Sequence, residues 1–112
     1  MKLESRFWLE EDGVKVFGKG PLILLEAVDK LGTLNKAANK LDMSYSKAWS
    51  MIKRAEAKLG FSLLERHTGG IEGGGSDLTP EARALIKSYR NFCKEADNIL
   101  DELYNKHFEN GF

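Results

Sequence analysis

Two stretches of the sequence gather the residues that could do chemistry. Between positions 36 and 58 the chain has six basic and two acidic residues, a net charge of +4, with serines and aromatic residues among the cations. Between positions 69 and 75, five of the chain's eleven glycines fall within seven positions. Cations, hydroxyls and exposed backbone N–H groups are the groups with which proteins bind phosphates. Both stretches therefore point to an anionic partner.

The glycine stretch has three interpretations. A phosphate-binding P-loop requires a Lys after the last glycine and a direct entry into a helix, and the sequence has neither. A linker between domains is disfavoured because the flanking segments are each too small to fold alone. The tip of a hairpin remains: glycines let the backbone approach phosphates, and Arg66 and Thr68 at its base add a cation and a hydroxyl. A loop that contacts nothing is the alternative.

The basic stretch is predicted to form a helix from the capping residue Ser44 to Gly60. Small and apolar residues recur at spacings of four, three and four, and we expect them to face the core: Ala48, Ile52, Ala55 and Leu59. At about 100° per residue, the opposite side carries hydroxyls and cations. These outward residues are Ser46, Ser50, Lys53, Arg54 and Ala57, with Lys47 and Trp49 on the flanks. Such a face is either solvated or a recognition helix for the major groove.

Two shorter helices are expected before it. Pro21 suits a first helical position, and a core face that ends at Gly32 follows, formed by Leu22, Leu25, Val28 and Leu31. Thr33 can cap a second helix, whose apolar residues are Leu34, Ala37, Ala38 and Leu41. The break at positions 42–43 is only a few residues long. The second and third helices therefore form a helix, a short turn and a helix.

Strands are expected on both sides of these helices. Asp12-Gly13 is a strong hairpin signal near the N-terminus, and the register it implies pairs Glu10 with Lys15, Leu9 with Val16, and Trp8 with Phe17. After the third helix, residues 61–66 can form a strand and residues 77–78 a return strand, with the glycines at the tip.

A long last helix is predicted from Thr79-Pro80-Glu81, which supplies a cap, a proline at the first position and an acid in the first turn. It runs to about Tyr104, which at 1.5 Å per residue is roughly 35 Å. Its apolar stripe is wider than one small core can cover along the whole length, so we expect homodimerisation through it, with wholly intramolecular packing as the alternative. The residues expected in the dimer interface are Leu85, Tyr89, Phe92, Ala96, Ile99 and Leu103.

Length and composition disfavour several other classes of protein. A chain of 112 residues fits one domain, with a hairpin at 1–19, three helices at 21–60, a wing at 61–79 and the long helix at 80–106. No apolar run approaches the about 20 residues of a membrane helix, and no secretory signal is recognisable, so we expect a cytoplasmic protein. The single Cys93 forms neither an intramolecular disulfide nor a zinc site. We find no catalytic or metal-ligand spacing and expect neither an enzyme nor a cofactor.

The formal net charge is zero, but positive and negative residues are concentrated in different parts of the chain. The +4 of positions 36–58 is balanced by a net charge of −4 between positions 95 and 109. An anionic partner meets the local potential, so a neutral total is compatible with a basic binding face. Chance patterning of the surface is the alternative.

Two motifs resemble a known family. The sequences SYSKAW at 44–49 and TGGIEGGGSDLT at 68–79 resemble the paired signatures of the winged-helix domain of molybdate-responsive transcription regulators, the ModE family. That domain is similar in turn to the N-terminal domain of LysR-type regulators. The resemblance covers roughly residues 20–100. It implies a mainly α-helical fold with a small β component (α+β), namely a winged helix-turn-helix with an N-terminal hairpin and a long dimerisation helix.

The resemblance also implies a function. It implies a homodimeric, sequence-specific regulator of transcription that binds double-stranded DNA, with the third helix in the major groove and the wing beside it. From the residues and the resemblance together, the expected DNA-binding positions are Lys36, Ser44, Tyr45, Ser46, Lys47, Trp49, Ser50, Lys53, Arg54, Arg66, Thr68, Gly69, Gly70, Gly73, Gly74 and Gly75. Trp49 either faces DNA or packs on the helix-turn-helix.

Full regulators of the family carry a C-terminal oxyanion-binding region after the long helix. This sequence ends at Phe112, so we expect that region to be lacking and leave open whether molybdate is sensed. Two other functions stay open: a protein-interaction module that keeps the winged fold, and a small oxyanion binder that uses the glycine N–H groups. The sequence does not give the operator or the sign of regulation.

Overall fold

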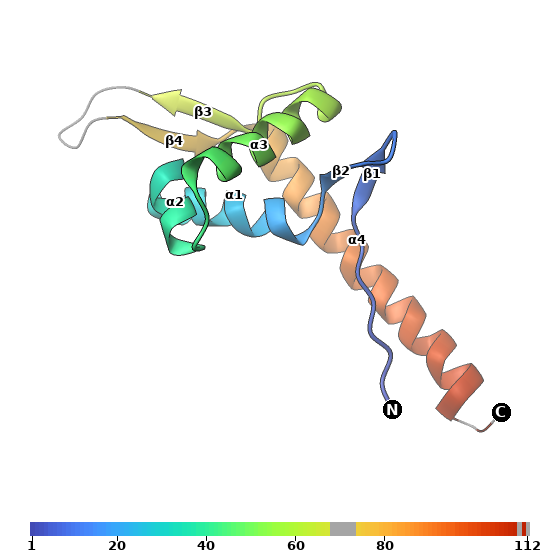
Figure 1. The fold of residues 1–112 in the computed structure, drawn as a ribbon. Coiled ribbons are helices and arrows are strands. Elements are labelled where there is room, and N and C mark those ends of the chain that lie inside the picture. The colour runs from blue at the N-terminus through green and yellow to red at the C-terminus, as the bar shows by residue number, and fades with distance from the viewer. Residues whose placement is uncertain (68–73, 110, 112) are drawn as a thin grey trace.

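The computed structural model describes residues 1–67, 74–109 and 111, and its order of elements is that of a winged helix-turn-helix (Figure 1). The elements are β1 (Leu9–Glu11), β2 (Val14–Phe17), α1 (Lys19–Leu31), α2 (Leu34–Lys40), α3 (Tyr45–Leu59), β3 (Leu64–His67), β4 (Gly75–Leu78), α4 (Pro80–Tyr104) and a π-helical turn η1 (Asn105–Glu109). Two antiparallel pairs, β1 with β2 and β3 with β4, make up the sheets. The predicted mainly helical fold with a small β component and a long last helix is confirmed.

The core forms where α1, α2, α3 and the start of α4 meet. Its largest fully buried side chains are Phe17, Leu24, Leu25, Val28 and Leu63. Helix α1 begins at Lys19, so the prediction that Pro21 is its first residue was wrong by two positions. The predicted core face of α1 was also too narrow because it left out Leu24. A helix that contacts α2, α3, β2 and β4 is covered on more than one side.

The helix-turn-helix is held by local capping, as the sequence predicts. The Thr33 hydroxyl oxygen accepts from the backbone N–H of Lys36, and the Ser44 hydroxyl oxygen accepts from that of Lys47, each at 3.0 Å. These bonds satisfy N–H groups that a helix start leaves without partners. Helix α3 ends at Gly60, whose φ of 82° lies in the left-handed region that favours glycine.

The N-terminal hairpin has the predicted turn and a different register. Glu10 pairs with Lys15 as expected, but Leu9 pairs with Phe17, so the predicted pairs of Leu9 with Val16 and of Trp8 with Phe17 were wrong. The extra residue is a bulge, which re-aims the side chains that follow it. Val16 and Phe17 are both buried, an arrangement that strict alternation along a strand does not allow.

In the β3–β4 hairpin, which is the wing, the first strand is shorter and the second strand is longer than predicted. Strand β3 begins at Leu64 rather than at position 61, and β4 begins at Gly75 rather than at position 77. The backbone N–H of Ser76 donates to the carbonyl oxygen of Gly32 at 2.8 Å. The hydroxyl of Thr79 donates to the carbonyl oxygen of Ser62 at 2.7 Å. The hairpin is therefore fixed to the end of α1 and to the loop before β3.

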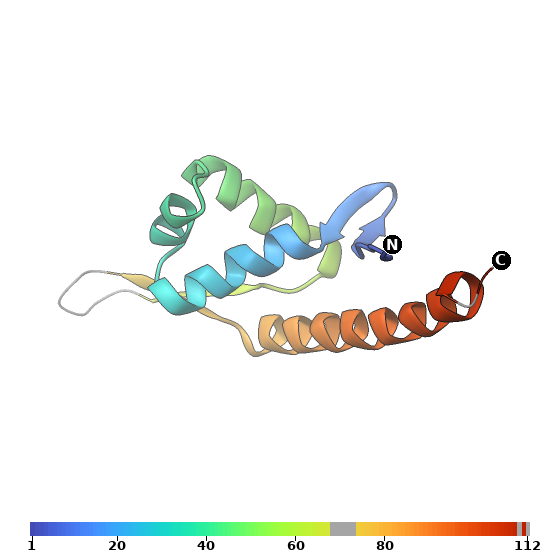
Figure 2. The same cartoon turned by 90° about the horizontal axis from the view of Figure 1, so that it is seen from below.

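Helix α4 extends well beyond the body, and residues 1–8, which we call the N-terminal arm, run along it (Figure 1). The hydroxyl of Tyr89 donates to the carbonyl oxygen of Phe7 at 2.7 Å, and the hydroxyl of Ser5 lies 3.0 Å from the Asp97 carboxylate. Figure 2 shows α1 between α3 on one side and α4 on the other. Helices α3 and α4 therefore lie on opposite sides of α1.

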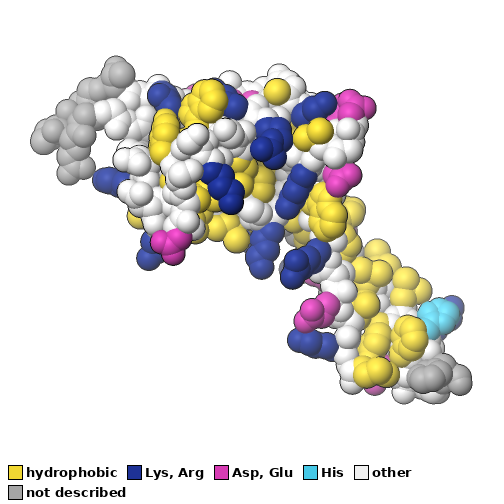
Figure 3. All heavy atoms as spheres, in the orientation of Figure 1, with side chains coloured by type: hydrophobic (Ala, Val, Ile, Leu, Met, Phe, Trp, Pro, Cys, Tyr) yellow, Lys and Arg dark blue, Asp and Glu magenta, His cyan; other side chains and the backbone are white. Residues whose placement is uncertain are grey.

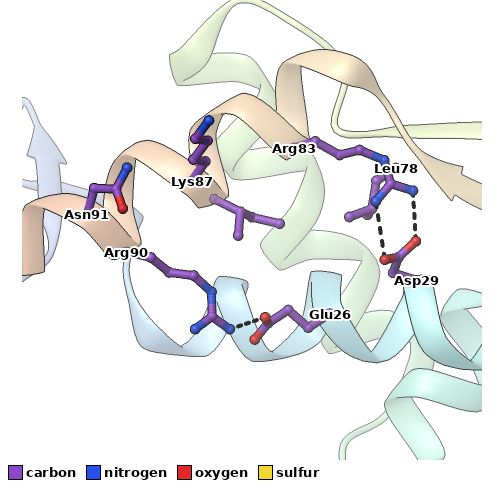
Figure 4. A pocket seen from close by; sticks show the side chains of 8 residues that line it. Glu26, Asp29, Leu78, Arg83, Lys87, Arg90 and Asn91 are labelled. Carbon is purple, nitrogen blue, oxygen red and sulfur yellow. Dashed lines mark hydrogen bonds and ion pairs between the residues drawn. The ribbon is translucent and has the colours of Figure 1, made fainter. Parts of the chain in front are cut away.

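Two ion pairs tie α4 to α1 (Figure 4). The guanidinium of Arg83 donates to both carboxylate oxygens of Asp29, at 2.8 and 3.2 Å, and Arg90 pairs with Glu26. Within the described ranges, no helix combines the length and the apolar character needed to cross a membrane.

Candidate nucleic-acid interface

Helix α3 has a buried side and an exposed polar side. Ala48, Ile52 and Ala55 are almost wholly buried against the core. Their small and compact side chains let α3 approach its neighbours closely. The opposite side is exposed and carries Ser46, Lys47, Ser50, Lys53, Arg54 and Ala57. No hydroxyl or cation of this outward side is used to build the core, so the whole face is available to a partner.

The cations on this face differ in whether an acidic side chain already pairs with them. Lys36, Lys47 and Arg54 are exposed and form no salt bridge with any residue that the structure describes. The ammonium of Lys53 lies 3.1 Å from the Glu56 carboxylate. Figure 3, which looks onto α2 and α3, shows Lys and Arg side chains over the upper and central part of this side of the molecule. An anion that meets this face therefore finds several uncompensated positive charges.

Two aromatic side chains stand on the exposed side of α3. Trp49 is 43% exposed, and the Lys53 ammonium lies 5.7 Å from the centre of its ring. Tyr45, also 43% exposed, accepts a hydrogen bond of 2.9 Å from the guanidinium of Arg66. The second contact joins the first residue of α3 to strand β3. It fixes the start of the helix relative to the wing.

A groove of about 300 Å³ lies between the starts of α2 and α3 and the wing. Its lining includes four residues that the sequence predicts to contact DNA, namely Tyr45, Arg66, Gly74 and Gly75. It also includes Asn35, which was not among the predicted residues. The signal was present, since Asn35 is an exposed polar residue just after the Thr33 cap. An amide there can donate to a phosphate or to a base edge.

The glycines of the wing differ in how closely other atoms surround them. A Cβ on Gly75 would lie 2.8 Å from the ring of His67 and 3.0 Å from the carbonyl oxygen of Gly32. Position 75 therefore favours glycine, because a side chain there would have to displace the His67 ring and crowd the backbone at the end of α1. Gly74 is exposed. The other predicted contacts of the tip, Thr68, Gly69, Gly70 and Gly73, lie outside the described residues.

The residues expected at a dimer interface fall into two groups. Leu85 and Tyr89 are half-buried and pack on the core of their own chain, where the Tyr89 ring meets Phe17 edge to face. Burial, together with a hydrogen bond to Cys93, raises the pKa of Tyr89. The outer residues of the stripe are largely exposed, with exposed fractions of 56% for Phe92, 58% for Ile99 and 46% for Leu103. Ala96 lies between them and is half-buried.

Metal-ligand geometry is not found in the part of the chain that the structure describes. No group of three or more His, Cys, Asp or Glu side chains there could hold a metal ion. His67 lies 3.5 Å from the Asp77 carboxylate, a pair that joins the two strands of the wing.

The fold and this face define a winged helix-turn-helix protein, with α3 in the position of the recognition helix and β3–β4 as the wing. The model of the bacterial regulatory helix-turn-helix proteins of the lysR family matches residues 21–83, and the chain belongs to this family. The predicted resemblance to the LysR and ModE type is therefore confirmed.

Curated relatives extend the comparison. The molybdenum transport protein ModE of Azotobacter vinelandii is 32% identical over 99 residues, which cover 88% of this chain and 37% of that protein. The transcriptional regulator ModE of Haemophilus influenzae is 38% identical over 66 residues, 59% of this chain and 26% of that protein. The chain thus spans between about a quarter and a little over a third of the length of these relatives.

Solved structures show the same fold. The crystal structure of the CbnR DBD–DNA complex aligns with 78% of this chain and 94% of that chain, at a TM-score of 0.55 and 25% identity. CbnR itself, a LysR family transcriptional regulator, aligns with 77% of this chain and 28% of that chain, at a TM-score of 0.54 and 27% identity.

Proposed function

We propose that this chain is a sequence-specific, double-stranded DNA-binding regulator of transcription that acts as a homodimer. The observation that carries the proposal is the outward face of α3. It carries hydroxyls, cations and half-exposed aromatic rings, with Ala57 as a small apolar residue among them, and it borders a groove that leads to the wing. A helix with this face has the dimensions and the chemistry to enter a major groove. The relatives named as transcriptional regulators and the solved DNA complex of the same fold support it.

Within this proposal the residues divide into two roles. Residues near the start of α3 read bases, because that end of a recognition helix reaches the base edges: Tyr45, Ser46, Lys47 and Ser50. Cations around them contact phosphates, which give affinity without sequence information: Lys36, Lys53, Arg54 and Arg66. The Ser44 oxygen already accepts the capping hydrogen bond from Lys47, and its hydroxyl hydrogen is free to donate to DNA. Trp49 is exposed enough to stack on the sugar-phosphate backbone.

The proposed homodimer forms through the outer stripe of α4. Phe92, Ile99 and Leu103 lie at spacings of seven and four, so they share one side of the helix. Exposed apolar side chains in a row of this length gain free energy when a second copy covers them. Two recognition helices related by a two-fold axis would then meet a roughly palindromic site.

The proposal is tested by titrating a mixed-sequence duplex with the protein at several salt concentrations and measuring fluorescence anisotropy. We expect binding that weakens steeply with salt, with a logarithmic slope of about −0.9 for each phosphate contact. A double variant, Lys36→Gln with Arg54→Gln, should bind more weakly and reduce the slope by about 2. Lys87→Gln is the matched control, because Lys87 is an exposed cation on α4, on the other side of α1.

The two alternative functions predict other outcomes. A protein-interaction module with the same fold would leave the duplex unbound even at low salt, and that result would overturn the proposal. An oxyanion binder would show a rise in melting temperature with molybdate or tungstate that DNA does not reproduce.

A further inference from the structure

A cavity of about 840 Å³ lies away from the α3 face, between the N-terminal arm, the start of α1 and the middle of α4. Small-molecule sites typically have volumes of about 300 to 1000 Å³. The cavity is therefore large enough for a drug-sized molecule. It does not use the outward side chains of α3, so it is separate from the proposed DNA-binding site.

Its charge is strongly positive. Five cations and one carboxylate line it, and the carboxylate, Asp97, is engaged by the hydroxyl of Ser5. Three of the cations come from three different segments and form no ion pair with any described residue, namely Arg6 in the arm, Lys19 in α1 and Lys94 in α4. Cations that converge from separate segments without a partner repel one another and favour a bound anion.

The start of α1 adds to this potential. The N-cap of α1 is Gly18, which brings no side-chain cap, and the first turn holds no acidic residue. Lys19, the first residue of the helix, lines the cavity. The positive end of the helix dipole is therefore left uncompensated on the side where the unpaired cations lie.

Beside Ser5, Asn91 and Cys93, the uncharged lining has an apolar and aromatic part. Phe7 and Trp8 of the arm, Leu22 of α1 and Tyr89 of α4 contribute to it. Trp8, the last residue of the arm, is 49% exposed, and its indole N–H donates to the Glu10 carboxylate at 2.8 Å. Lys15 lies over the Trp8 ring at 5.8 Å from its centre, so this ring already takes part in a cation–π contact. An inorganic anion alone would leave these rings uncovered, whereas an aromatic acid would use both parts of the lining.

We propose that this cavity binds a small aromatic carboxylate, with the ring on the apolar wall and the carboxylate directed to Lys19 and Lys94. The site goes beyond the proposed DNA binding and does not depend on it. DNA is the less favoured occupant because Lys94 lies on α4, which is on the opposite side of α1 from α3 (Figure 2). A bound molecule would connect the arm, α1 and α4 in one contact.

The two tryptophans of the chain allow a direct test, since Trp8 lines the cavity and Trp49 lies on α3. In the full chain carrying Trp49→Phe, Trp8 is the only tryptophan. We expect benzoate to change its fluorescence in a saturable way, and benzamide, the neutral molecule of the same shape, to leave it unchanged. A response to benzamide equal to that to benzoate, or no saturable response to benzoate, would overturn the proposal.

Variants that each remove one positive charge, made in the Trp49→Phe protein, identify the residues that contact the carboxylate. Lys19→Gln and Lys94→Gln should each weaken benzoate binding by about three- to fivefold, the size of a partly exposed ion pair. Lys30→Gln, at the exposed far end of the same helix α1, should bind benzoate unchanged. Circular dichroism melts of each variant exclude loss of folding as the cause.

Competing anions distinguish the remaining occupants. Sulfate or molybdate that displaces benzoate at equal concentration would show a site for inorganic anions and contradict the aromatic part of the proposal. A loss of affinity for mixed-sequence duplex in Lys94→Gln, as large as in the Lys36 and Arg54 double variant, would assign these cations to DNA instead.

Discussion

At the scale of single residues, the cations of the α3 face differ because some already have partners. Lys53 shares its charge with Glu56, at 3.1 Å, while its neighbour Arg54 is unpaired among the described residues. Both are exposed and both lie on the same turn. A phosphate contact from Lys53 must compete with an existing ion pair, and one from Arg54 does not.

We therefore expect Lys53→Gln and Arg54→Gln to weaken binding to all duplexes alike, with the larger loss for Arg54→Gln. The reason is that phosphate contacts carry affinity and no base preference. Anisotropy titrations on one selected and one random duplex check both parts. A loss confined to the selected duplex would show that the residue reads bases.

Substitutions of Ser46 and Ser50, unlike those of Lys53 and Arg54, should change the preference among DNA sequences. Each places a small hydroxyl on the outward side of α3 near its start, where base edges are in reach. Ser46→Ala or Ser50→Ala should change the preference among sequences recovered from a random duplex pool, by about 1 to 3 kcal/mol at one position. Equal loss on selected and random DNA from Ser46→Ala would contradict its assignment to base reading.

At the scale of elements, Glu56 connects α3 to the residue that precedes β3. Its side chain is 13% exposed, and one carboxylate oxygen accepts from the backbone N–H of the buried Leu63 at 2.7 Å. Glu56→Ala leaves that N–H without its acceptor, which should lower the free energy of unfolding by about 1 to 3 kcal/mol. Urea denaturation measures it. Glu56→Gln keeps an accepting oxygen and should lose less, and an equal loss in both variants would contradict this role.

The ion pair between α1 and α4 predicts a dependence on pH. The hydrogen bond from Arg83 holds the pKa of Asp29 below its usual value of 3.8. A carboxyl whose pKa is depressed by folding stabilises the folded state above its unfolded pKa, and this contribution is lost as pH falls through the folded value. The free energy of unfolding should therefore fall below about pH 4, and Asp29→Asn should reduce that fall. The effect should be small because both side chains are about half exposed and screened. Urea unfolding at pH 5 and below pH 3 measures it.

The elements also show how far sequence reasoning reaches. The caps at Thr33, Ser44 and Thr79 and the helices they begin could be predicted because capping and helical periodicity are local. The bulge between the Leu9 and Glu10 pairs could not be predicted, because it depends on how Val16 and Phe17 pack into the core. Within the site, the outward residues of α3 followed from periodicity alone. The contact of Tyr45 with Arg66 joins positions 21 residues apart and has no signature in the sequence.

At the scale of the whole molecule, α1 separates the helix that we propose to bind DNA, α3, from the helix that we propose to form the dimer, α4. Helix α3 lies on one side of α1 and α4 lies on the other (Figure 2). The molecule is 62 Å long and 28 Å wide, because α4 extends beyond the body. A dimer formed through α4 would leave both α3 faces free.

Ile99→Asp should abolish that dimer while leaving the fold intact. Ile99 is 58% exposed, so the monomer loses little burial, whereas a charge in a closed apolar interface is costly. Sedimentation equilibrium should show the wild type at twice the mass of the variant. Asn98→Asp, exposed on the neighbouring position, is the control. A wild type that sediments as a monomer across the micromolar range would contradict the proposed dimer.

The central claim is that α3 and the wing form the surface that binds DNA. Amide chemical shifts of the labelled protein, recorded by NMR while a duplex is added, test it most directly. If α3 and the wing bind DNA, the largest changes will be in residues 44–54 and 64–78, with small changes in α4 beyond position 87. Changes that are largest along α4 or the N-terminal arm, or none at low salt, would contradict it.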